Sequence, residues 1–121
     1  MATTVAETGS TKYAAKKGGI RTILSLKDAV THQNCAELQS VYEDCIRRDK
    51  IEIIFDCQAL TFLDSEALEL LLRIHEDLKS RGGALKLIAL NEVCTDILIA
   101  TRLANTLNIY KDIHGAVRKW P

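Results

Sequence analysis

The sequence has few aromatic residues and no excess of charge of either sign. Aromatic side chains make up 5% of the 121 residues, which argues against the stacking platforms that bind single-stranded nucleic acid. Lysine and arginine together number 16, and so do aspartate and glutamate. No run of like charge is longer than a pair, so the sequence predicts no basic stripe and no nucleic-acid partner.

The usual signatures of metal and nucleotide sites are also missing. The chain has four cysteines: Cys35, Cys45, Cys57 and Cys94. None are in CxxC spacing, and no histidine lies close enough to complete a zinc site. The first three fall where apolar residues are expected, which indicates buried thiols in a reducing compartment. The glycine pairs at 18–19 and 82–83 match no phosphate-binding loop, so we expect neither a metal nor a cofactor.

The sequence shows no targeting segment and no membrane span. Its start lacks the basic residues and apolar stretch of a secretory signal. No apolar run approaches the roughly 20 residues that a membrane-spanning helix requires. We therefore expect a cytoplasmic protein that does not associate with a membrane.

What is present is the composition of a single globular domain. Hydrophobic residues make up 47% of the chain and charged residues 26%, which are ordinary values. A length of 121 residues suits one domain with a real core. Residues 1–19 contain almost no large apolar side chains. They predict a flexible N-terminal arm, or at best a poor edge strand, ahead of a domain over 20–121.

Strand and helix patterns alternate along this domain. Near-continuous apolar runs predict strands, and apolar stripes at helical spacing predict helices. The expected strands are 21–27, 50–56, 84–90 and a short edge strand at 107–110, and the expected helices are 34–48, 65–80, 92–104 and a turn or two within 112–119. This alternation predicts an α/β fold with a mostly parallel central sheet of about four to five strands and helices packed against it. Asn34 is expected to cap the first helix.

The most informative stretch is 51–72, IEIIFDCQALTFLDSEALELLL. It predicts a buried strand, a short connection and a helix that begins at Asp64 and Ser65. Either residue can cap the helix, Glu66 and Glu69 suit its positive end, and spacing alone favours this structural role. A functional role is also open, because α/β proteins place sites at the carboxyl ends of parallel strands. A phosphate on Ser65 would sit at a helix N-terminus.

The run LTFLDSEALELLL, followed by a helix, RGGALKLIAL and a closing amphipathic helix, resembles a STAS domain and is similar to bacterial anti-sigma factor antagonists. The resemblance covers residue 21 to the end of the chain. It implies a regulatory binding module and not an enzyme, in which Ser65 is phosphorylated by a partner serine kinase that is itself the anti-sigma factor. The unmodified form would bind this kinase and free the sigma factor. Phosphorylation would end the complex, and a phosphatase would reset it. The residues expected to bind the partner are Asp64, Ser65, Glu66 and Glu69.

Three places differ from the pattern of that family. Glu66 and Ala67 stand where Ser or Thr and then Gly are usual, so Glu66 adds a negative charge beside the acceptor hydroxyl. The family's Gly-x-Leu-Asp loop reads LKDAVTHQN here, and Asp28 or His32 matches its Asp. An unphosphorylated STAS scaffold, for example beside a transporter ATPase, is therefore the alternative function. A small enzyme that uses Cys57 or a histidine is a third hypothesis, with little support because no set of residues converges on it.

Overall fold

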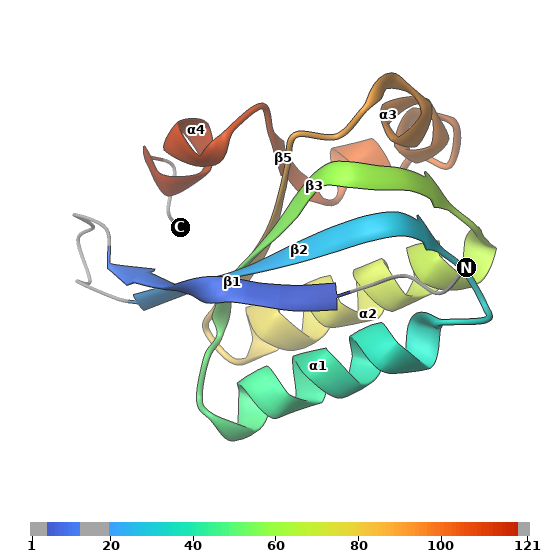
Figure 1. The fold of residues 1–121 in the computed structure, drawn as a ribbon. Helices are drawn as coiled ribbons and strands as arrows, with labels where there is room; N and C mark the ends of the chain where they lie inside the picture. Colours follow the sequence, from blue (N-terminus) through green and yellow to red (C-terminus); the bar gives the residue numbers. More distant parts are fainter. Residues whose placement is uncertain (1–4, 13–19, 119–121) are drawn as a thin grey trace.

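The computed structural model describes residues 5–12 and 20–118 and shows an α/β domain (Figure 1). Within these residues a five-stranded sheet has the order β1-β2-β3-β4-β5. The strands β2 to β5 are parallel and β1 is antiparallel to β2, which confirms the predicted fold class. In chain order the elements are β1 (Val5–Lys12), β2 (Ile20–Val30), α1 (Cys35–Arg47), β3 (Glu52–Leu63), α2 (Ser65–Ser80), β4 (Ala84–Ile88), α3 (Glu92–Ala100), the 3₁₀ turn η1 (Leu103–Asn105), β5 (Asn108–Tyr110) and α4 (Ile113–Arg118).

The main core lies between the sheet and the helices α1 and α2, which run side by side beneath the strands in Figure 1. Apolar residues of β2, β3 and β4 alternate toward these helices, and the apolar stripe of α2 meets them. Ile53, Phe55 and Leu78 are buried completely at the centre of this layer. Helix α3 adds Cys94 and Leu98 to the same core. It packs against β3 at the end where that strand runs past β4.

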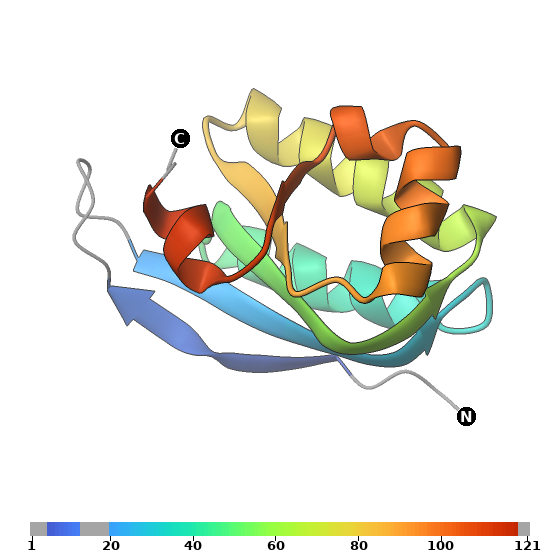
Figure 2. The ribbon, with the colours of Figure 1, turned by 90° about the horizontal axis from the view of Figure 1, so that it is seen from above.

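The opposite face of the sheet is covered only in part, by the short helix α4 (Figure 2). Its apolar contact is a small cluster of Ile54, Ile88 and Ala116. Beside it the buried Lys86 donates a hydrogen bond from Nζ to the Ala116 carbonyl oxygen at 2.7 Å. Burial, together with the nearby Arg21 charge, lowers the pKa of Lys86 to about 8. This face is therefore more polar than the face that α1 and α2 cover.

The N-terminal segment differs from its main prediction. Val5–Lys12 forms the edge strand β1, paired with β2 from Val5↔Leu26 to Lys12↔Ile20, so a flexible arm is wrong for these residues and the edge-strand alternative describes them. Their weak apolar pattern is compatible with an edge position, where pairing on one side is enough. The rest of the predicted arm, 1–4 and 13–19, lies outside the described residues.

Two further boundaries differ from the sequence prediction. The strand predicted at 50–56 continues as β3 to Leu63, so the expected short connection is in fact the second half of the strand. Register shifts in the β2–β3 pairing interrupt its alternation, which hides the strand pattern. The helix predicted over 92–104 ends at Ala100. The chain leaves it through Arg102, whose positive φ of 66° is incompatible with a continuing helix.

Candidate functional site

Two helices begin at the same edge of the sheet. β2 ends at Val30 and leads into α1, and β3 ends at Leu63 and leads into α2. The Asp64 N–H donates to the Val30 carbonyl oxygen at 3.3 Å, which ties the two connections together. In Figure 1 both helix starts lie at the carboxyl ends of these parallel strands. The sequence prediction placed Ser65 at this edge, and the structure has it there.

Asp64 is the cap of α2. Its backbone is extended, and its Oδ1 accepts the Ala67 N–H at 2.9 Å. Its Oδ2 accepts the His32 N–H at 2.7 Å and lies 3.2 Å from His32 Nδ1. Partial burial by itself raises the pKa of Asp64, but the N–H groups of Ala67 and His32 and the His32 ring outweigh this effect and hold the pKa below its usual value.

Ser65 is the first residue of α2 and is exposed to solvent. Among the described residues its hydroxyl has no hydrogen-bond partner. The sequence left open whether Asp64 or Ser65 caps the helix, and the structure assigns the cap to Asp64. The Ser65 hydroxyl is therefore available for chemistry at no cost to the helix.

The residues that follow Ser65 divide into buried and exposed positions. Ala67 is completely buried, so the methyl group that it has in place of a usual glycine faces the core and not a partner. Glu66 and Glu69 are exposed and make the surface around Ser65 acidic. Burial, followed by the negative charges of Asp64 and Glu66, raises the pKa of the Cys35 thiol at the start of α1, against the opposing positive charge of Arg73. Charged groups of α2 therefore lie near the start of α1.

The loop before α1 brings His32 to this site. The sequence left Asp28 and His32 as alternatives for the acidic loop position of the STAS pattern. Asp28 lies within β2, exposed and with a φ of 59°, whereas His32 contacts Asp64 directly. Only the order of residues in the loop pointed to His32, because 32 positions separate it from its partner in the chain.

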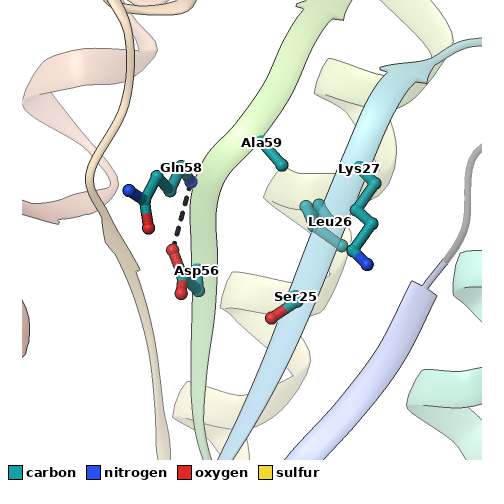
Figure 3. Close-up of a pocket in the computed structure, with 6 residues that line it drawn as sticks. All are labelled: Ser25, Leu26, Lys27, Asp56, Gln58 and Ala59. Atoms are coloured by element: carbon teal, nitrogen blue, oxygen red, sulfur yellow. Dashed lines mark hydrogen bonds between the residues drawn. The ribbon is translucent and has the colours of Figure 1, made fainter.

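The structure contains a second polar region that the sequence analysis did not predict. A hollow of about 190 Å³ opens on the sheet between β2 and β3, lined by Ser25, Leu26, Lys27, Asp56, Gln58 and Ala59 (Figure 3). It lies at a bulge, where the pairing shifts between Ser25 and Lys27. Asp56 Oδ1 accepts the Gln58 N–H at 3.1 Å and so braces the bulge. The side chains that line the hollow include no nucleophile hydrogen-bonded to a base. The irregular strand pairing at the bulge explains why polar side chains line it.

The structure offers little to the enzyme hypothesis. Cys57 is buried, and burial raises the pKa of its thiol far above neutrality, the reverse of what a nucleophilic cysteine needs. The described residues contain no group of three or more His, Cys, Asp or Glu side chains arranged to hold a metal ion. In the same part of the chain, every helix is too short or too polar to cross a bilayer.

Comparison with known proteins agrees with this geometry. The model of the STAS domain family matches residues 12–116. A candidate anti-sigma factor antagonist from Thermotoga maritima has a similar structure, with a TM-score of 0.77 at 21% identity over 92% of this chain and 94% of its own. An anti-sigma factor antagonist from Mycobacterium paratuberculosis gives 0.74 at 17% identity over 96% of each chain. No curated protein sequence matches.

One structural relative is known in a modified state. The Bacillus cell fate determinant SpoIIAA in its phosphorylated form has a TM-score of 0.62 at 14% identity, over 91% of this chain and 98% of its own. At these identities the structural likenesses establish the fold, and the family match, which spans most of the sequence, establishes the relationship. The chain belongs to the STAS domain family.

Proposed function

We propose that this protein is an anti-sigma factor antagonist in a partner-switching system. In its unmodified form it binds an anti-sigma factor that is also a serine kinase. The kinase transfers the γ-phosphoryl group of ATP to the Ser65 oxygen, which loses its proton, and ADP is released. The modified protein then leaves the complex, and a phosphatase hydrolyses the phosphate ester to restore it. In this role the protein acts by binding and not by catalysis.

The observation that carries this proposal is that Asp64 caps α2 while the neighbouring Ser65 is exposed. Asp64 supplies the cap of α2, so Ser65 is exposed and its hydroxyl carries no structural hydrogen bond within the described residues. A phosphate would add a charge of about −1.5 to −2 at neutral pH. The N–H groups of the first helical turn, which have no acceptor within the helix, tolerate that charge. A desolvated interface with a partner would not tolerate it.

The surface around Ser65 has the mixed character of a docking site. Phe62, two residues before the cap, leaves 44% of its surface exposed, which is unusual for a phenylalanine. Asp64, Glu66 and Glu69 follow it in the chain and add negative charge to the surface at the start of α2. A partner with an apolar contact and basic residues around it would complement this surface.

The direct test is phosphosite mapping on protein purified from its native cells. The tryptic peptide from Ile51 to Arg73 contains both Thr61 and Ser65, so fragment ions must separate the two positions. We expect phosphate on Ser65 in an amount that changes with growth conditions. Absence of phosphate from Ser65 in exponential growth, stress and stationary phase would refute the switch.

A second candidate function is an unphosphorylated STAS scaffold in a larger complex, and Glu66 is the observation that favours it. Glu66 is exposed directly beside the acceptor hydroxyl, where like charge opposes the approach of ATP. The Glu66→Ser variant separates the two functions. Faster phosphorylation of this variant by the partner kinase supports a switch that Glu66 slows. A partner complex that forms equally with Ser65→Asp and with the unmodified protein supports the scaffold.

A further inference from the structure

The loop between β2 and α1 is held rigidly against the start of α2. Asn34 Oδ1 accepts the Thr31 N–H at 2.8 Å, and Asn34 Nδ2 donates to the Ala29 carbonyl oxygen at 2.9 Å. The Thr31 hydroxyl accepts the Gln33 N–H at 3.2 Å. These bonds fix the backbone on both sides of His32, so its own N–H points at Asp64 Oδ2. The position of the His32 ring is therefore set by the backbone as well as by its contact with Asp64.

The His32 imidazole, which can gain a positive charge, lies beside the acidic residues at the start of α2. Its ring touches the carboxylate of the residue that directly precedes Ser65, and 63% of its side-chain surface is exposed. The other charged or titratable groups on the segments that flank it are Lys27 and Asp28 on β2, Cys35 and Glu37 on α1, and Asp64, Glu66, Glu69 and Arg73 on α2. Lys27 and Arg73 are cations, and the remaining groups apart from the Cys35 thiol are carboxylates. His32 is therefore the histidine of this group, and histidine is the side-chain type that gains or loses charge near neutral pH.

We infer that His32 is the counter-ion of a phosphate on Ser65, an inference that rests on the proposed function and adds pH to its regulation. Asp64 already uses both carboxylate oxygens on N–H groups, so it cannot move away from an added negative charge. The phosphate would then meet the carboxylates of Asp64 and Glu66 at close range, and protonation of the nearby imidazole offsets this repulsion. The modified state is therefore favoured at pH 6 over pH 8.

The sign follows from linkage. A group that binds its proton more tightly in the folded, modified protein than in the unfolded chain stabilises the fold at low pH, and this contribution disappears as the pH rises. Negative charge on residue 65 should therefore destabilise the protein more at pH 8 than at pH 5.5. Without His32 that difference between the two pH values should vanish.

The test is a double-mutant cycle that needs no kinase. Thermal unfolding is measured at pH 5.5 and pH 8 for the unmodified protein, Ser65→Glu, His32→Gln and the double variant. We expect the loss in Tm caused by Ser65→Glu to be larger at pH 8 by about 3–6 °C, and this excess to disappear in the His32→Gln background. Glutamate is used because it stays ionised across this range, whereas a phosphate itself titrates near pH 6. His114→Gln is the matched control, since His114 is exposed on α4.

The outcomes separate this inference from the proposed function. An equal pH dependence of the Ser65→Glu effect with and without His32 would overturn the inference, even if Ser65 is phosphorylated in cells. Loss of the pH dependence in His114→Gln as well would also overturn it. If glutamine disturbs the loop, His32→Asn repeats the cycle with a shorter amide. Phosphosite mapping decides the proposed function independently of this result.

Discussion

The starts of α1 and α2 occupy equivalent places in the fold and behave in opposite ways. Each follows a parallel strand, and each is preceded by a residue that favours helix caps, Asn34 or Asp64. Asp64 has an extended backbone, with φ −93° and ψ −177°, and caps its helix. Asn34 has φ −132° and ψ 7° and makes no side-chain cap bond. Its side chain turns back into its own loop instead.

The difference comes from the backbone and not from the residue type. Asn91 precedes α3 with φ −76° and ψ 175°, and its Oδ1 accepts the Cys94 N–H at 2.7 Å. An asparagine therefore caps a helix in this protein when its backbone is extended, as capping requires. At the start of α1, the Asn34 side chain forms its hydrogen bonds with the loop that carries His32. At the start of α2, the Asp64 side chain caps the helix, so the hydroxyl of the next residue, Ser65, is not needed for capping.

The largest expected effect comes from a charge placed on that free hydroxyl position. Ser65→Asp should remain folded, because an acidic residue suits the first turn of a helix. Its affinity for the partner kinase should fall by about 10- to 100-fold, or about 1.4–2.7 kcal/mol, measured by isothermal titration calorimetry. Ser40→Asp, at an exposed serine of α1, is the matched control and should bind normally. Tight binding by Ser65→Asp would contradict an electrostatic switch.

The second-largest effect is expected when the side-chain amide nitrogen of Asn34, at the start of α1, is replaced by an oxygen. Asn34 is buried, and its Nδ2 donates to the Ala29 carbonyl oxygen. Asn34→Asp places an acceptor against that acceptor and should cost about 1–3 kcal/mol in the free energy of unfolding, measured with urea at pH 7. Asn34→Ser, which keeps a hydrogen-bond donor, should cost less. Equal stability of Asn34→Asp and the unmodified protein would show that the loop does not depend on this bond.

Removal of the α2 cap should have a comparable or slightly smaller effect. Asp64→Ala loses the acceptor of the Ala67 N–H and of the His32 N–H. We expect a loss of about 1–2 kcal/mol in the free energy of unfolding. Asp96→Ala, at an exposed aspartate of α3, should change stability by less than about 0.5 kcal/mol. A cost at Asp64 no larger than at Asp96 would contradict its assignment as the cap.

The two helix starts should also differ in their response to acid. The pKa of Asp64 is lowered in the folded protein, so its contribution is present at neutral pH and is lost as the pH falls through that pKa. The stability difference between the unmodified protein and Asp64→Asn should therefore shrink between pH 7 and pH 3. The corresponding difference for Asn34→Ser should stay constant, because neither side chain titrates. Urea unfolding at several pH values measures both, and parallel pH profiles would refute this prediction.

The smallest effect is expected where the hydroxyl is removed without a change in charge. Ser65→Ala should leave the free energy of unfolding within about 0.5 kcal/mol of the unmodified value, because the cap belongs to Asp64. It should also bind the partner kinase normally and accept no phosphate. A loss near 1 kcal/mol would show that the Ser65 hydroxyl shares in capping after all.

Local patterns were enough to predict much of this structure. The helix predicted over 65–80 matches α2 as observed, Ser65–Ser80, because its apolar stripe and its end at Gly82 are local features. Gly82 adopts a φ of 83°, a conformation that glycine adopts readily and other residues seldom do. Where tertiary pairing interferes, local patterns failed. The bulges between β2 and β3 concealed the second half of β3.

The α/β class, the start and end of α2 and the acidic run around Ser65 follow from the sequence, since each depends on the spacing of neighbouring residues. The folded backbone was needed to establish that Asp64 and not Ser65 is the cap, that the Asn34 side chain bonds within its own loop, and that His32 reaches the site. These outcomes depend on the backbone angles at two connections and on a contact across 32 positions of the chain. The pairing of β2 with β3 brings the two connections together, and no local pattern in the sequence encodes that pairing directly.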